Sequence, residues 1–110
     1  MPRVIKNNFD SYKFWYYSSF SYEALIYLYK EGELVGRIVF IKNGEELPEN
    51  GMASPFGTPV PSIHLHVCRF NDVINILREE KPLHLFLNVD HKIGILATDD
   101  FEPVGEEEGP

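Results

Sequence analysis

Two histidines and one cysteine alternate along a short segment, in the pattern His64-x-His66-x-Cys68. On a β-strand these three side chains would share one face, with ~6.5 Å between positions two residues apart. Imidazole nitrogens and thiolates are zinc ligands, and His84 on a second alternating segment could complete a metal site. The alternative is that these imidazoles are half-buried on a sheet face and hydrogen-bond to their neighbours. Because the sequence lacks an H-E-x-x-H pattern and a second cysteine, we expect no metal and no other cofactor.

Cys68 could also act as a nucleophile, with His66 as its base. Adjacent side chains on one strand face rarely align as a catalytic pair, and no third group is evident to orient the base. We therefore expect Cys68 to be buried and inert. The G-x-S-x-G, G-x-x-x-x-G-K-[ST] and G-x-G-x-x-G patterns are absent. The residues favour a non-catalytic protein, and the alternative is a metal- or thiol-dependent enzyme that uses His64, His66 and Cys68.

Aromatic residues are concentrated near the start of the chain, where ten of the 15 lie between Phe9 and Tyr29. Aromatic side chains on a sheet can stack with the bases of a single-stranded nucleic acid. The candidates for stacking are Tyr12, Phe14, Trp15, Tyr16 and Tyr17. The residues that could neutralise phosphates are Lys6, Lys13, Lys30, Arg37 and Lys42. Because binding to a polyanion needs a positive field, we expect this aromatic cluster to form core or a subunit interface instead.

The chain has 110 residues with 10 basic and 17 acidic side chains, giving a net charge of -7. Six acidic and no basic residues follow residue 98, which leaves 10 basic and 11 acidic groups in residues 1–98. Segment 99–110 is predicted to be a solvated acidic tail, or alternatively a polyanion that competes for a basic groove. The single cysteine, the lack of a secretory pattern and the lack of an apolar run of about 20 residues favour a cytoplasmic protein without membrane contact.

The length favours one domain over residues 1–98. Residues 1–10 are predicted to be a loose arm and residues 47–62 a proline-rich loop. Apolar side chains at helical spacing predict one amphipathic helix over 70–81, which ends before Pro82. Strands are predicted over 12–17, 22–30, 34–42, 63–68, 83–89 and 92–98. Short turns impose antiparallel pairing, so we expect an α+β fold with one curved antiparallel sheet of about six strands, four before the helix and two after it.

Several predicted strands carry large side chains on both faces, and a helix of about 12 residues spans only ~18 Å. It can cover one face of part of such a sheet. Because monomers rarely leave large apolar patches bare, we expect a second subunit to cover the rest, and hence a homodimer. The face expected to contact a subunit or a ligand carries His64, His66, Cys68, His84 and Phe86.

Four strands followed by the helix over 70–81 resemble the fold of the single-stranded-DNA-binding transcriptional regulators, including the Whirly type. Small bacterial proteins have also been placed in this fold. The resemblance covers residues 12–98 and implies a curved antiparallel sheet on a helix, dimers, and single-stranded nucleic acid as an alternative partner. It rests on topology, and the chain departs from these proteins because it lacks a basic excess, so no functional residue is assigned by it. Segments 69–83 and 102–108 also resemble a family of small proteins, but this second resemblance does not indicate which activity to expect.

Overall fold

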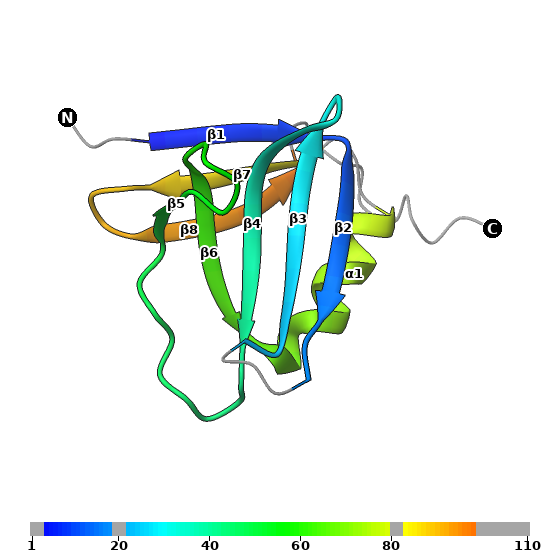
Figure 1. The fold of residues 1–110 in the computed structure, drawn as a ribbon, viewed down its shortest axis with the longest axis vertical. Helices are drawn as coiled ribbons and strands as arrows, with labels where there is room; N and C mark the ends of the chain where they lie inside the picture. Colours follow the sequence, from blue (N-terminus) through cyan, green and yellow to red (C-terminus); the bar gives the residue numbers. More distant parts are fainter. Residues whose placement is uncertain (1–3, 19–21, 80–82, 99–110) are drawn as a thin grey trace.

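The computed structural model describes residues 4–18, 22–79 and 83–98 (Figure 1). In this part of the chain one α-helix accompanies eight strands, so the expected α+β class is confirmed. The elements in chain order are β1 (Val4–Phe9), β2 (Ser11–Tyr16), β3 (Ala24–Lys30), β4 (Glu33–Ile41), β5 (Gly51–Ala53), β6 (Val60–His66), a 3₁₀ turn (Val67–Arg69), α1 (Phe70–Glu79), β7 (Leu83–Asn88) and β8 (Ile93–Thr98). The acidic segment 99–110 lies outside the described residues.

The strands form two sheets rather than the single sheet that we expected. One has the order β1-β7-β8 and the other the order β2-β3-β4-β6-β5. The strands of the smaller sheet run across those of the larger one (Figure 1). The larger sheet is also mixed, because β4 and β6 pair in parallel while every other pair is antiparallel.

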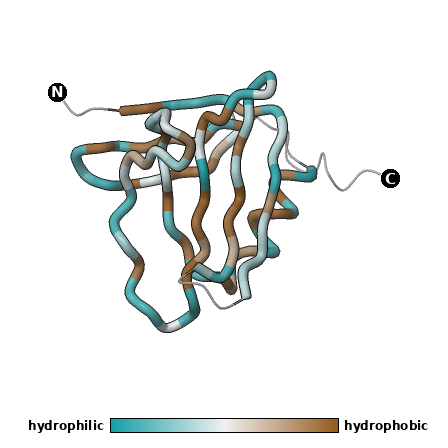
Figure 2. Tube along the Cα trace, in the orientation of Figure 1, coloured by the Kyte–Doolittle hydropathy of each residue, from teal (hydrophilic) through white to brown (hydrophobic). Residues whose placement is uncertain are grey.

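The core lies between the larger sheet on one side and α1 with the smaller sheet on the other. Ile26 on β3, Phe40 on β4 and Ile63 on β6 meet Phe70 of α1 and Leu85 of β7 in one buried cluster. Figure 2 shows the hydrophobic segments along β3 and β4, the two central strands. Burial of this cluster is the main contribution to stability that the fold offers, because apolar area removed from water contributes roughly 25 cal/mol per Å².

The predicted loose arm is wrong for residues 4–9, which form β1 and pair with β7 along its whole length. Residues 6–8 of β1 are polar, yet Phe9 is buried and Asn7 reaches the larger sheet, where its Nδ2 donates to Val35 O over 2.8 Å. β1 thus extends the β7–β8 pair to a sheet of three strands.

The proline-rich loop is also shorter than predicted, because β5 lies within it and β6 begins at Val60. Pro61 is tolerated in β6 because the parallel ladder with β4 begins only at the next residue, Ser62. The long connection from β4 to β6 is what allows parallel pairing, since two parallel strands need a crossover.

The face of the larger sheet that points away from the smaller sheet is covered by the chain itself. Leu25 and Val39 are 1% and 0% exposed there. Side chains of the flanking strands and of the 42–59 connection pack around them, namely Tyr17, Tyr22, Tyr29, Leu34 and Leu47. A second subunit is therefore not needed to shelter this face, contrary to the reason for which we expected a homodimer.

In the described part of the chain, no helix is long and apolar enough to span a membrane.

Candidate functional site

His64 lies on β6 and points away from the core, on the outer face of the larger sheet. It is half-buried, and its Nδ1 has no hydrogen-bond partner. Burial lowers the pKa of its imidazole below the ordinary value, and the neighbouring Arg37 guanidinium lowers it further. Arg37 is held in place across the parallel ladder, where its Nε donates to Ser62 Oγ over 2.8 Å. His64 is therefore a neutral, partly buried side chain at neutral pH.

His66 and Cys68 do not share a strand face, because the strand ends at His66 and residues 67–69 form a 3₁₀ turn. The His66 Nε2 lies 2.7 Å from Glu45 O, while the Cys68 backbone N–H donates to Asn43 Oδ1 over 3.0 Å. Cys68 is exposed, so the expectation of a buried thiol is wrong. The sequence does not predict the turn, because Val67 continues the alternating pattern that indicates a strand. The alternation predicted that His66 and Cys68 lie side by side on one strand face, and the structure does not place them so.

His84 and Phe86 lie on β7, but on the outer face of the smaller sheet. Leu83, which precedes His84, and Leu85, which lies between His84 and Phe86, point into the core. Because His64 lies on the outer face of the larger sheet, the whole core separates His84 from His64. The three candidate metal ligands His64, His66 and His84 are thus not brought together, and the described residues contain no group of three potential ligands. The expected face of five residues is divided between two opposite sides of the molecule.

Aromatic side chains gather along β2, which is an edge strand of the larger sheet. The exposed fractions of the Phe14, Trp15 and Tyr16 side chains are 50%, 45% and 62%. These three residues are called the aromatic edge below. Such exposure of three consecutive large rings is uncommon on a strand, because exposed aromatic surface is costly in water.

The aromatic edge presents rings on both faces of the larger sheet. Phe14 and Tyr16 pack on Phe70 of α1, with ring centroids 5.9 Å and 4.8 Å away. On the opposite face, Trp15 packs on Tyr27 with centroids 5.2 Å apart. Tyr12 is half-buried against the core, and Tyr17 packs beside Tyr22. Sequence alone located these aromatic residues, but it did not indicate Phe70 as their platform.

The backbone of the aromatic edge is unpaired on its outer side among the described residues, since β3 is the sole neighbour of β2. The Tyr17 N–H donates to Glu23 O over 3.1 Å, in register with the pairing of Tyr16 and Ala24. In an antiparallel pair the bonded and outward-facing residues alternate. The N–H and C=O groups of Tyr12, Phe14 and Tyr16 therefore point away from β3.

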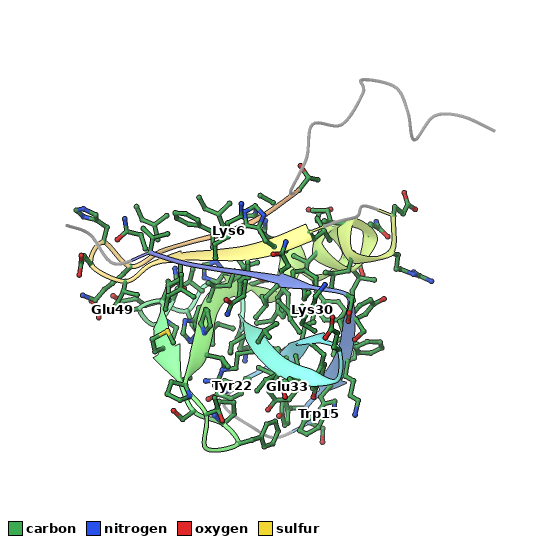
Figure 3. The ribbon with its side chains drawn as sticks, turned by 90° about the horizontal axis from the view of Figure 1, so that it is seen from above. Lys6, Trp15, Tyr22, Lys30, Glu33 and Glu49 are labelled. Carbon is green, nitrogen blue, oxygen red and sulfur yellow. The ribbon has the colours of Figure 1, made fainter. Side chains whose placement is uncertain are left out.

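The basic residues expected to neutralise phosphates are spread over several strands, with Lys6 on β1, Lys13 on β2 and Arg37 on β4. Lys6 projects from the smaller sheet, on the opposite side of the molecule from Trp15 (Figure 3). Arg37 lies in the middle of the larger sheet and is bonded to Ser62. Lys13 is on β2 itself, with Nζ 5.6 Å from the centroid of the Tyr29 ring. Lys13 is thus the basic residue of β2 itself, while Lys30 ends the neighbouring strand β3 and Arg37 interacts with Tyr27, the ring on which Trp15 packs.

A second apolar surface covers the outer face of the smaller sheet. Val4, Ile93 and Ile95 are exposed there, and Phe86 lies between Lys6 and Ile95 in the sheet register. A shallow hollow elsewhere, beneath the 54–58 loop, is lined by Glu33, Leu34, Phe56 and Thr58. It presents one carboxylate and no histidine or cysteine, so it offers no acid–base or nucleophile–base pair.

No protein-family model matches the chain, and neither the curated proteins nor the solved structures gave a match.

Proposed function

We propose that this protein is a non-catalytic interaction module that acts as a homodimer and binds through the aromatic edge. The observation that carries the proposal is the exposure of Phe14, Trp15 and Tyr16 on a strand whose outer backbone groups face solvent. Tyrosine, tryptophan and phenylalanine are enriched at protein interfaces because they bury a large area at low entropic cost.

The composition of β2 supports binding rather than protection of the edge. Edge strands are usually kept short, bulged or charged, since their unpaired groups can capture another chain. β2 carries one charged side chain, Lys13, between the aromatic residues. At the other end of the larger sheet, β5 has only three residues and follows the protective pattern.

Single-stranded nucleic acid is the alternative partner, in line with the resemblance to the single-stranded-DNA-binding regulators. The exposed rings of the aromatic edge suit base stacking. The position of Lys6 and the engagement of Arg37 count against it, because phosphate neutralisation supplies most of the affinity of such proteins.

Light scattering over a wide range of protein concentration tests the proposal. We expect the wild-type chain to exceed the monomer mass of 12.7 kDa as concentration rises, and the double variant Phe14→Ser/Tyr16→Ser to stay monomeric. Phe56→Ser is the matched control, because Phe56 is 63% exposed and Tyr16 is 62% exposed. A monomer at every concentration overturns the proposal. Salt-sensitive binding of a labelled oligonucleotide by such a monomer would replace it with the alternative.

A further inference from the structure

We infer that the aromatic edge docks on a second copy of itself, by antiparallel pairing of β2 with β2 around a twofold axis at Phe14. This inference rests on the proposed function and specifies the geometry of its dimer. The result would be one continuous sheet of ten strands, five from each copy.

The outward-facing backbone groups fit this arrangement. Tyr12, Phe14 and Tyr16 form the outward set, and Phe14 is its centre. With Phe14 opposite Phe14 of the second copy, Tyr12 lies opposite Tyr16 of that copy, and the converse pair follows by symmetry. Each of these pairs exchanges two main-chain hydrogen bonds in an antiparallel ladder. A shift of two residues in either direction leaves one or more outward-facing residues without a partner from the set.

The side chains fit the same register. On the α1 side, the Phe14 rings of the two copies become neighbours and extend the cluster already formed with Phe70. On the opposite face, Lys13 lies across from Trp15 of the second copy. Directly opposed residues have Cβ atoms about 5 Å apart, and an ammonium group over an indole ring gains about 0.5–1 kcal/mol at an exposed site. Lys13 already contacts the face of one aromatic ring, that of Tyr29.

The arrangement is closed, because a twofold axis uses the same edge of both copies. The opposite edge of the larger sheet is the three-residue β5, which offers little backbone for further growth. Face-to-face stacking through the smaller sheet is the less suitable arrangement. It would bury the Lys6 ammonium, which lies beside Phe86 in the register, without an acidic partner from the described residues of the same face.

Cross-linking through an introduced cysteine tests the register. The exposed Cys68 is first replaced in the variant Cys68→Ser. Phe14→Cys is then added, which places the new thiol on the twofold axis. Bonded antiparallel pairs have Cα atoms about 5.5 Å apart, within the range that a disulfide requires. Ser11→Cys in the same background is the control, because that exposed residue of β2 lies far from its own copy in this register.

We expect rapid formation of a covalent dimer by the Phe14→Cys variant under mild oxidation, and none by the Ser11→Cys variant. Light scattering on the same unoxidised samples and on the Cys68→Ser parent separates the possible failures. If the unoxidised Phe14→Cys variant is still a dimer, the absence of a cross-link at position 14, or equal cross-linking at position 11, overturns the inferred register and leaves the homodimer intact. A monomeric Phe14→Cys variant beside a dimeric parent supports the placement of Phe14 in the interface. A monomeric parent overturns both the inference and the proposed function.

Discussion

Phe14 packs edge-to-face on Phe70 with 5.9 Å between their centroids, yet half of the Phe14 side chain remains exposed. The two rings thus have different roles in one cluster. Phe70 is buried at the start of α1 and also packs on Phe40 of the core, with centroids 5.0 Å apart. It holds Phe14 and Tyr16 in fixed orientations at the edge of the sheet. An aromatic surface ordered in advance loses less entropy on binding.

Substitution of Phe70 and of Phe14 should therefore have unequal effects on stability. Phe70→Ala should lower the free energy of unfolding by about 3 kcal/mol, because it leaves a cavity in the core. Phe14→Ser should lower it by less, about 1 kcal/mol, since half of that ring is already in water. Urea denaturation at low protein concentration, where the monomer prevails, measures both values. Equal losses would show that the exposed ring of Phe14 is as strongly packed as that of Phe70.

Gly94 should resist substitution because β8 approaches β6 closely at this point. A Cβ atom at position 94 would lie 2.9 Å from Ile63 Cβ, closer than two carbon atoms can pack. We expect Gly94→Ala to lower the free energy of unfolding by about 2 kcal/mol through overpacking. Gly51→Ala is the control, since a Cβ atom at position 51 would meet nothing within 4 Å beyond its chain neighbours. Thermal denaturation of the two variants compares them, and an equally stable Gly94→Ala variant would contradict the close approach.

Asn50 links the 42–59 connection to β6 and to the turn between β7 and β8, and its substitution should lower stability. Its Oδ1 accepts from the His64 N–H over 2.7 Å, and its Nδ2 donates to Lys92 O over 3.0 Å. Asn50→Ala removes both bonds and leaves the His64 N–H without its acceptor. We expect a loss of about 2 kcal/mol in the free energy of unfolding, measured by urea denaturation. Asn50→Asp keeps the acceptor for His64 and should recover part of this loss; a variant as unstable as Asn50→Ala would contradict the assignment.

Glu31 is a position where substitution should stabilise the fold. Its φ is 52°, and Gly32 follows with φ of 86°, in the turn between β3 and β4. Asparagine tolerates this left-handed conformation better than glutamate, and Asn-Gly is the preferred pair for such a turn. The contact that the Glu31 N–H makes with Asp10 Oδ2 at 3.1 Å uses only the backbone of residue 31 and is retained. Glu31→Asn should raise the free energy of unfolding by about 0.5 kcal/mol, and an unchanged or lower melting temperature would refute this.

Stability should fall as the pH drops below the ordinary pKa of histidine, and His64 should account for part of that fall. Burial, and then Arg37, lower the pKa of His64 in the folded state. Below about pH 6.5 the unfolded chain therefore binds protons that the folded chain excludes, and unfolding becomes more favourable until the pH passes the folded pKa. Urea denaturation at about pH 7.5 and pH 5.5 measures this difference. It should be smaller in His64→Gln, and an identical pH dependence would contradict the prediction.

Local patterns predicted much of the secondary structure. The alternation of leucines at 83, 85 and 87 located β7 and its buried face, and apolar spacing located α1 from Phe70. These features depend on neighbours in the sequence, so the sequence carries them directly.

Such local patterns could not predict which distant strands pair with one another. Ile5 and Asn7 alternate with exposed residues in β1, but the segment is too polar to be recognised as a strand. The parallel pairing of β4 with β6 depends on the path of the 42–59 connection, which no local spacing records. The candidate site was affected because β7 and β8 form a sheet apart from β6, which carries His84 away from His64. The aromatic edge was located by composition, whereas its exposure depends on β2 being at the edge of the sheet.

Hydrogen exchange at the outward-facing amides of β2 tests the central claim most directly. The amides of Tyr12, Phe14 and Tyr16 should exchange rapidly in dilute protein and become protected as concentration rises, because the second copy accepts their hydrogen bonds. Those of Lys13 and Trp15 face β3 and should be protected throughout. Rapid exchange of all three outward-facing amides at low and high concentration alike would contradict the pairing of β2 with a second copy.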